Sequence, residues 1–391
     1  MNVPGFEVFG DEERQAINEL FDLNGGILFA HGFDAMRKGV YRVREFERAF
    51  AARMGVPHAQ AVSSGSAAVK VGLVALGVMP GNEVIVPAFT FIATIEAVLE
   101  VGAVPVIVDV DDSLNMNPEA FEAAITPKTR AVVPVHMLGA PADMDALTAI
   151  ASRHGLQVME DNAQGCGGSY KGRLLGTIGQ AGAFSLDAGK TIMTGEGGMV
   201  LTRDEPSYIR ARAFHDHGHE YSTSIGRGQE GALIVGFNYR MTELQGAIGL
   251  VQLGKLDMIL SAQRKNKRAL KALIADMPVQ FRRIHDAEGE LADAIVFFVE
   301  SPDMAAKFAK RMGEEGLGTK NLPDAMNWHF AGRWKHLRQR LPMPDAPWDG
   351  RWAQSAELLE RAIAVPVMVK MTEARIAEIA EKLLRIAKEI L

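Results

Sequence analysis

Short, continuously apolar runs alternate with stretches of helical periodicity through the first two thirds of the chain. Several of these runs, such as VPVIV and AVVPV, contain no polar residue. Strands that are buried on both faces have this composition, as in a parallel sheet with helices on each side. The pattern predicts seven strands, at His58–Val62, Glu83–Pro87, Val104–Val110, Ala131–His136, Gln157–Glu160, Ala181–Leu186 and Gly198–Thr202.

Helical patterns lie between the predicted strands. They cover Ser66–Leu76, Ala93–Val101, Asn117–Ala124 and Met144–His154. This alternation of strand and helix favours an α/β doubly wound domain with a mostly parallel sheet of about seven strands. The last two strands follow each other closely across GEGG. We therefore expect a hairpin-like end to the sheet, with one antiparallel strand.

The pattern changes in the last third of the chain. A basic stretch near Leu253–Ala275 predicts a solvated helix that leads into a second domain. A nucleic-acid patch is disfavoured there because no aromatic residues are interleaved with the basic ones. One strand pattern (AIVFFVE) and two helical patterns (MAAKFAKRMGEEG and MTEARIAEIAEKLLRIAKEI) follow. We expect an N-terminal helical segment over 1–30, a large α/β domain over 31–260 and a small α+β domain over 261–391.

The composition is that of a soluble globular protein rather than a nucleic-acid or membrane protein. The 391 residues exceed what one core usually covers, and the net charge of −6 gives no basic face for nucleic acid. No apolar run approaches the roughly 20 residues of a membrane span. The N-terminus lacks the basic and apolar regions of a signal peptide. A single cysteine, Cys166, excludes an intrachain disulfide, and we expect a cytoplasmic protein.

Candidate chemistry begins with Lys190, in the stretch FSLDAGKTIMTGEGG. Its Ala-Gly-Lys-Thr run resembles the end of a P-loop, but Phe184 stands where the first P-loop glycine is required. A turn and a strand pattern follow Thr191, whereas a P-loop opens a helix. The alternative is a lysine whose free amine forms an imine with an aldehyde. Flanking glycines permit close packing of the backbone on a flat ring, although such a lysine is often only a surface residue.

Two further motifs stand at predicted strand ends. Asp161 closes the apolar strand LQVMED, where open α/β sheets bind their ligands. It is either a helix cap or a carboxylate that faces the ring nitrogen of pyridoxal phosphate (PLP). The run Ser63–Ala68 follows the first strand and opens a helix, which makes it an anion site or an ordinary N-cap. Phe89 and Phe91 belong to the core unless one of them stacks on a bound ring.

Six ordered blocks that cover nearly the whole chain resemble the DegT/DnrJ/EryC1/StrS family of PLP-dependent sugar aminotransferases. These blocks are SSGSAA, EVIVPAFTF, VHMLGAPADMD, MEDNAQGCGGSYKGRLLGTIG, FSLDAGKTIMTGEGG and GFNYRMTELQGAIGLVQL. The resemblance implies a fold-type I aminotransferase that works as a homodimer with shared active sites. It assigns the cofactor to Gly65, Ser66, Ala67, Phe91, Asp161, Gln164, Ser185, Lys190 and Asn238.

The resemblance also implies a role for each position. Lys190 would hold PLP as an imine, Asp161 would pair with the ring nitrogen, and Gln164 would lie near the ring hydroxyl. Phe91 would stack on the ring. The phosphate would be held by Gly65, Ser66 and Ser185, with Asn238 reaching it from the partner subunit. Lys190 and Asp161 are therefore the expected catalytic residues.

The implied reaction moves an amino group from an amino acid, expected to be L-glutamate, to a keto- or aldehyde-sugar of a cell-surface polysaccharide or lipopolysaccharide. Dehydrating members of the family carry histidine at the lysine position, so Lys190 favours amino transfer. The chain departs from the family at Asp187–Gly189, where bulkier residues are common, and at Ser66, where threonine is common. Two alternatives stay open: a nucleotide-linked 3- or 4-keto-deoxysugar as acceptor, and a non-catalytic regulator that binds PLP or a sugar.

The segment Phe214–Glu220 is dense in histidine. Alternate residues of one loop rarely supply the three or four ligands of a metal site, so we expect no metal. An acidic substrate offers another role, and His215, His217, Arg240 and His329 are the candidate contacts. A packing or capping role is an equally good interpretation for each of them.

Overall fold

The computed structural model describes residues 4–341 and 347–391. Its largest element is a seven-stranded sheet in the order β1-β9-β8-β5-β4-β2-β3. The strands are β1 (His58–Val62), β2 (Glu83–Pro87), β3 (Val104–Val108), β4 (Thr129–Val132), β5 (Gln157–Asp161), β8 (Ala181–Ser185) and β9 (Gly198–Thr202). Neighbours from β3 to β8 run parallel, and β9 is antiparallel to both β8 and β1. The mostly parallel sheet is confirmed, but the antiparallel strand lies inside the sheet rather than at its end.

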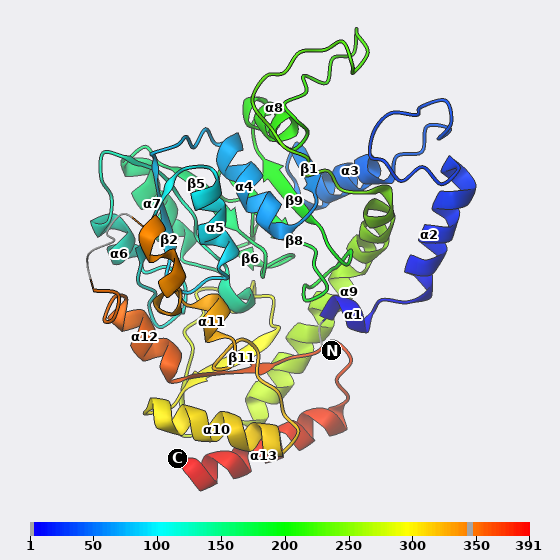
Figure 1. Ribbon diagram of the computed structural model, residues 1–391. Helices are drawn as coiled ribbons and strands as arrows, with labels where there is room; N and C mark the ends of the chain where they lie inside the picture. The colour runs from blue at the N-terminus through cyan, green and yellow to red at the C-terminus, as the bar shows by residue number, and fades with distance from the viewer. Residues whose placement is uncertain (1–3, 342–346) are drawn as a thin grey trace.

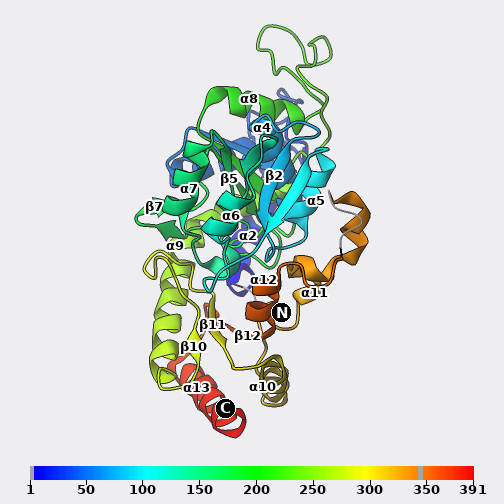
Figure 2. The same cartoon turned by 90° about the vertical axis from the view of Figure 1, so that its left-hand side faces the viewer.

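Helices cover both faces of this sheet (Figures 1 and 2). Val84 and Val86 pack with α4 (Gly65–Ala75) and α5 (Ala93–Glu100) on one face. Ile85, between them, packs with α6 (Pro118–Ala123) and α7 (Met144–Arg153) on the other. Successive side chains of a strand point to opposite faces, so two covered faces require apolar residues at every position.

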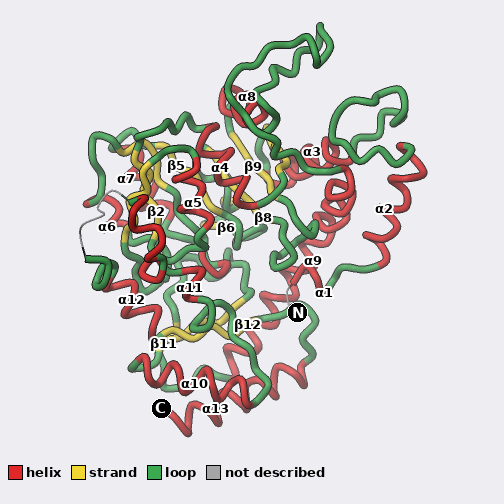
Figure 3. The backbone as a smooth tube through the Cα atoms, viewed as in Figure 1, coloured by secondary structure: helices red, strands yellow, loops and turns green. Residues whose placement is uncertain are grey.

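The smaller C-terminal part contains a three-stranded antiparallel sheet, β10 (Gln280–Phe281), β11 (Ala294–Phe298) and β12 (Ala362–Pro366). Two helices, α10 (Pro302–Glu314) and α13 (Glu373–Ile390), pack with it around a separate core. Figure 3 shows this part below the large sheet. The short elements α11 (Met326–His329) and α12 (Ala353–Glu360) precede β12. A small α+β part is thus confirmed.

A 31-residue helix, α9 (Glu243–Leu273), runs from the large sheet to the small one (Figure 1). It begins ten residues earlier than the basic pattern predicts, at a Thr242–Gln245 capping box. Two glycines, Gly246 and Gly249, disfavour a helix in the sequence. In the structure they allow α3 (Arg42–Met54) to pack closely against α9, because a Cβ on Gly246 would lie 2.6 Å from Val43 N. The prediction of a solvated helix holds for one face only: Asp257 and Lys271 are exposed, whereas Leu256 and Gln263 are buried. The proposed domain boundary at 260/261 falls within α9 and stays a prediction.

The N-terminal residues form α1 (Pro4–Glu7) and α2 (Asp11–Asn24). A small hairpin, β6 (Ser169–Tyr170) with β7 (Arg173–Leu174), lies between β5 and β8 in the sequence, and α8 (Glu205–Phe214) follows β9. The predicted strand Ala131–His136 is shorter as β4 because Pro134 has no N–H to donate, although Val135 still bridges Asp161. No helix among the described residues is long and apolar enough to cross a membrane.

Candidate active site

The carboxyl ends of β2, β5 and β8 and the start of α4 surround a cavity of about 210 Å³. Loops that follow parallel strands leave at the same edge of the sheet, so residues far apart in sequence meet there. Seven of the nine residues predicted to bind the cofactor line this cavity: Gly65, Ser66, Phe91, Asp161, Gln164, Ser185 and Lys190. The described chain therefore brings together most of the predicted site, while the individual roles stay predictions.

Asp161 is held by two hydrogen bonds at the end of β5. Its Oδ2 accepts from Thr94 Oγ1 at 2.7 Å, and its Oδ1 accepts from Ala163 N at 3.1 Å. Thr94 Oγ1 also lies 2.7 Å from Thr90 Oγ1. Asp161 is 4% exposed, and the two hydrogen bonds fix the orientation of its carboxylate in the cavity wall. The sequence analysis missed Thr94, although two threonines one helical turn apart after a strand end are a usable signal.

Glu160, the neighbour of Asp161, has a structural role. Strand alternation places the two carboxylates on opposite faces of β5. Glu160 accepts hydrogen bonds from Gly176 N at 2.8 Å and from Ile178 N at 2.6 Å, and it pairs with His136. One carboxylate thus fixes the loop before β8, while the other faces the cavity.

Lys190 lies in a turn between β8 and β9, and no helix begins at this turn. The P-loop alternative therefore lacks the helix that it requires. The Nζ atom of Lys190 lies 3.7 Å from Asp187 Oδ2, and the Lys190 side chain is 21% exposed. The carbonyl of Lys190 accepts from Gly5 N at 3.0 Å, so the N-terminal segment covers the turn. Asp187 is a second residue that the sequence analysis did not assign.

The start of α4 forms one end of the cavity. Ser64 Oγ caps the helix by accepting from Ala67 N at 3.1 Å. That contact gives the amide of Ala67 another partner, and Ala67 does not line the cavity. Gly65 packs against Ser185 so closely that a Cβ there would lie 2.6 Å from Ser185 Cβ. A helix N-terminus, hydroxyl groups and a side-chain-free position together suit a phosphate group.

The aromatic side of the cavity is completed from the C-terminal third of the chain. Residues after β2 bond to the α11 segment, through Thr90 N to His329 O at 2.9 Å. The rings of Phe91 and His329 lie 5.4 Å apart. His329 Nδ1 donates to Ala325 O at 2.9 Å. Burial lowers the pKa of His329, the hydrogen bond to Ala325 opposes this, and the charge of Lys190 lowers it further. His329 is therefore neutral at neutral pH.

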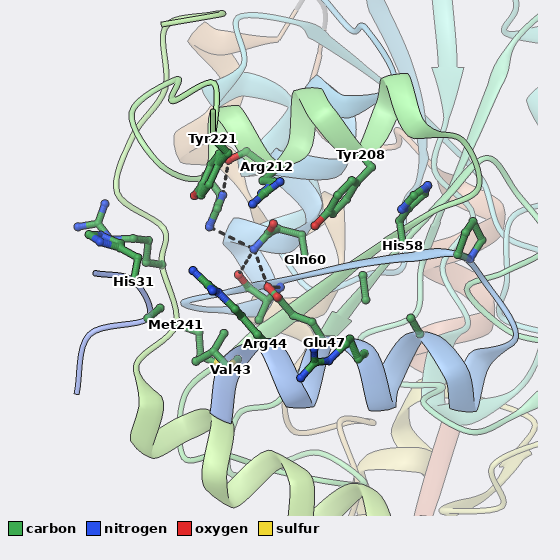
Figure 4. Close-up of a pocket in the computed structure, with 18 residues that line it drawn as sticks. His31, Val43, Arg44, Glu47, His58, Gln60, Tyr208, Arg212, Tyr221 and Met241 are labelled. Carbon is green, nitrogen blue, oxygen red and sulfur yellow. Dashed lines mark hydrogen bonds between the residues drawn. The ribbon is translucent and has the colours of Figure 1, made fainter. Parts of the chain in front are cut away.

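The remaining predicted residues lie elsewhere in the subunit. His215 and Arg240 line a second cavity of about 270 Å³ between α3, α8 and β1 (Figure 4). His217 and Asn238 are exposed and line neither cavity. Only His329, of the four candidate substrate contacts, is brought to Lys190 within one chain. Contacts of the other three to a substrate stay predictions.

His215 is part of a buried hydrogen-bonded chain in this second cavity. Its Nδ1 donates to Arg212 O at 2.6 Å. Gln60 Nε2 lies 3.1 Å from His215 Nε2 and 2.7 Å from Glu47 Oε1. Burial lowers the pKa of His215 to about 4, and burial raises the pKa of Glu47 to about 7. Among the described residues, no three His, Cys, Asp or Glu side chains are grouped to hold a metal ion.

The model of the DegT/DnrJ/EryC1/StrS aminotransferase family matches residues 34–384. The chain belongs to this family. It is an aminotransferase with PLP as its cofactor, and the cavity suits that cofactor: an amine at Lys190, a buried carboxylate at Asp161, an aromatic ring at Phe91 and an anion-binding helix start at Gly65. The match covers both sheets, and the fold is that of fold-type I aminotransferases.

Solved structures support the fold over the whole length. An aminotransferase from Psychrobacter cryohalolentis is 28% identical, with full coverage of both chains and a TM-score of 0.87. 3-Amino-5-hydroxybenzoic acid synthase is 29% identical, with 97% of each chain covered and a TM-score of 0.84. A putative sugar aminotransferase from Streptococcus pneumoniae, in its PMP form, is 21% identical; 100% of this chain and 98% of that chain are covered, with a TM-score of 0.85.

Proposed function

We propose that this aminotransferase moves the amino group of L-glutamate to a keto- or aldehyde-sugar used in cell-surface polysaccharide synthesis. The observation that carries the proposal is the meeting of Lys190 and Asp161 in one cavity. A nucleophilic amine and a fixed carboxylate at a helix start are needed for amino transfer, whereas a regulator that only binds a ligand has no use for the amine. The adjoining chamber carries Gln164, Thr319 and Asn321, whose polar groups suit the hydroxyls of a sugar.

Bound PLP supplies an electron sink for the carbon that exchanges its amino group. Lys190 Nζ would hold the cofactor covalently and, once the donor amine has displaced it, would take the proton from the donor's α-carbon. Asp161 would keep a proton on the ring nitrogen. Thr94 and Ala163 fix the Asp161 carboxylate for that task. The neutral ring of His329 would close the cavity beside Phe91 without adding a charge.

The acceptor that we propose is the precursor of 8-amino-3,8-dideoxy-manno-octulosonate, a sugar acid of lipopolysaccharide. Four stretches are similar to the aminotransferase that makes this sugar: PGFEVFGDEE, HDHGHE, RKNKRALKA and NWHF with the following RWKHL. A nucleotide-linked 3- or 4-keto-deoxysugar is the alternative acceptor. The two differ in whether the acceptor carries a free carboxylate or a nucleotide diphosphate.

The decisive experiment compares the wild-type protein with Lys190→Ala. Wild-type protein with PLP should absorb at about 410–430 nm and lose this band with glutamate. It should then aminate one sugar from a panel of the octulosonate aldehyde and nucleotide-linked keto-sugars. Lys190→Ala should lack both the band and turnover. Full turnover by this variant would exclude the proposed role of Lys190, and a wild-type protein inert toward every donor and acceptor would exclude the proposed reaction.

We also propose that two copies share their active sites, with Asn238 serving the partner's phosphate group. Asn238 is exposed and lies away from the Lys190 cavity of its own chain. Apolar side chains nearby are exposed as well, with Val235 at 86% and Phe237 at 55%. Such a surface favours burial against another copy.

Complementation tests the shared site. Lys190→Ala and Asn238→Ala, each impaired alone, should regain activity when mixed, dissociated and reassociated. In a mixed dimer one of the two sites has both native residues, so about one site in four recovers. No recovery despite proven subunit exchange would place Asn238 outside the partner's site.

A further inference from the structure

A larger chamber of about 480 Å³ opens beside the Lys190 cavity. The two share the lining residues Ala163, Gln164, Lys190 and His329. The other walls come from Pro4, from the 318–321 segment before α11, and from residues 366–368 at the end of β12. A substrate whose amine or carbonyl reaches Lys190 must therefore extend between the large sheet and the small one.

Besides His329, three ionisable side chains line this chamber: Lys190, Lys320 and Asp293. Its described lining contains no arginine. His329 is neutral because burial and the charge of Lys190 lower its pKa. If Lys190 is committed to the cofactor, Lys320 is the cation left to meet an anionic part of a substrate.

Lys320 is held in place from both its backbone and its side chain. Its N–H donates to Ala364 O at 2.8 Å, and its carbonyl accepts from Leu322 N at 2.8 Å. Its ammonium forms an ion pair with Asp293, which is 5% exposed. Asp293 O in turn accepts from Val367 N at 2.9 Å, which ties the pair to the chamber wall.

The ammonium keeps binding capacity after this pairing. A lysine has three N–H donors, and the described structure gives Lys320 Nζ one side-chain partner, Asp293. The Lys320 side chain is 23% exposed and lines the chamber, which leaves room for a ligand beside it. A carboxylate bound on the side opposite Asp293 would be closer to the ammonium than to the Asp293 carboxylate, so attraction would exceed repulsion.

We infer that Lys320 binds the α-carboxylate of the amino donor. The inference rests on the proposed function, because an α-amino acid that presents its amine at Lys190 carries its carboxylate on the adjoining carbon, inside the same chamber. A carboxylate that leaves water for such a site needs a hydrogen-bonded cation. Lys320 supplies it from the C-terminal part of the chain, whereas Lys190 and Asp161 come from the large sheet. Lys320 thereby selects α-amino acids over simple amines.

The test must not leave the buried Asp293 carboxylate without its cation, because this alone destabilises a protein. The informative pair is therefore Asp293→Asn, which keeps the ammonium, and Asp293→Asn with Lys320→Met, which removes it. Lys370→Met, at an exposed position outside the chamber, is the control. Dissociation constants are measured by calorimetry on the PLP-loaded proteins with glutarate, an unreactive dicarboxylate, and with its neutral diamide. KM and kcat for glutamate are measured in parallel.

Loss of one charge-assisted hydrogen bond should weaken glutarate binding by about 10- to 100-fold in the double variant relative to Asp293→Asn. The diamide should bind all proteins alike, KM for glutamate should rise with glutarate's dissociation constant, and kcat should change less. Equal glutarate affinity in the two variants, or no glutarate affinity in the wild type, overturns the inference. Because glutarate binding needs no turnover, this result is independent of whether the proposed amino transfer occurs.

Discussion

The contact between Gly65 and Ser185 gives a sharp test of the anion-binding end of the active site. A Cβ at position 65 would lie 2.6 Å from Ser185 Cβ and 2.8 Å from Ser185 Oγ. Carbon atoms in contact prefer about 3.5–4.0 Å, so Gly65→Ala must move the start of α4 and β8 apart by about 1 Å. Such overpacking costs about 1–3 kcal/mol, against a gain of about 0.5–1 kcal/mol for alanine over glycine in a helix.

The cofactor should register this shift more strongly than the fold does. Each hydrogen bond to a charged group contributes about 1.5–3 kcal/mol, so losing one phosphate contact should weaken PLP binding by about 10- to 100-fold. Equilibrium binding of PLP, followed by the absorbance of the lysine-bound form, measures this directly. Urea unfolding of the cofactor-free protein measures the cost to the fold.

Gly254→Ala is the matched control, because Gly254 also lies in a helix but a Cβ there meets no atom within 4 Å. It should stabilise the protein slightly, by about 0.5–1 kcal/mol, and leave PLP affinity unchanged. Adding Ser185→Gly to Gly65→Ala removes the clashing atoms. It should restore part of the lost stability but not the PLP affinity, because Ser185 is itself assigned to the phosphate. Wild-type affinity in Gly65→Ala itself would refute the assignment of this end of the cavity to phosphate.

Three further changes test other parts of the structure. Thr94→Val removes the donor to Asp161 Oδ2 and should lower turnover by about 10- to 100-fold while the lysine-bound absorbance persists; unchanged turnover would show that Asp161 needs no support. Phe91→Leu should raise the dissociation constant of PLP by about 3- to 10-fold, since ring stacking contributes about 0.5–1.5 kcal/mol beyond burial, and an unaltered constant would place the ring elsewhere. Burial lowers the pKa of His215 from 6.5 to about 4 in the folded state. Between these two pH values the unfolded chain therefore binds more protons than the folded chain. The free energy of unfolding should fall as the pH drops from 6.5 toward 4. The loss of unfolding free energy should reach about 3 kcal/mol. His215→Gln should remove this part of the pH dependence when the free energy of unfolding in urea is measured between pH 7.5 and 5. An equal pH dependence in the variant and the wild type would contradict the prediction.

The local pattern of apolar residues was sufficient to predict the seven strands of the large sheet. His58–Val62, Glu83–Pro87 and Gly198–Thr202 were predicted with the bounds that the structure has. Most positions of a strand that is covered on both faces are apolar, so five consecutive residues are enough to identify it. Asp161 could be named as a candidate because it ends another such apolar strand, whereas Lys190 was named from its glycine-rich motif.

The sequence by itself therefore determined the α/β class, the strand ends and the residues that stand there. Only the tertiary structure decided which of them meet. It joined His329 to Phe91 through the contact of α11 with the end of β2, separated His215 and Arg240 from Lys190, and brought Lys320 into the substrate chamber. It also made Gly246 and Gly249 part of a long helix, because positions without side chains let α3 pack closely against that helix. The physical reason is the separation along the sequence over which each effect acts. Strand and turn preferences depend on neighbouring residues. A cavity is formed by segments more than a hundred residues apart, and their packing cannot be predicted from a local pattern.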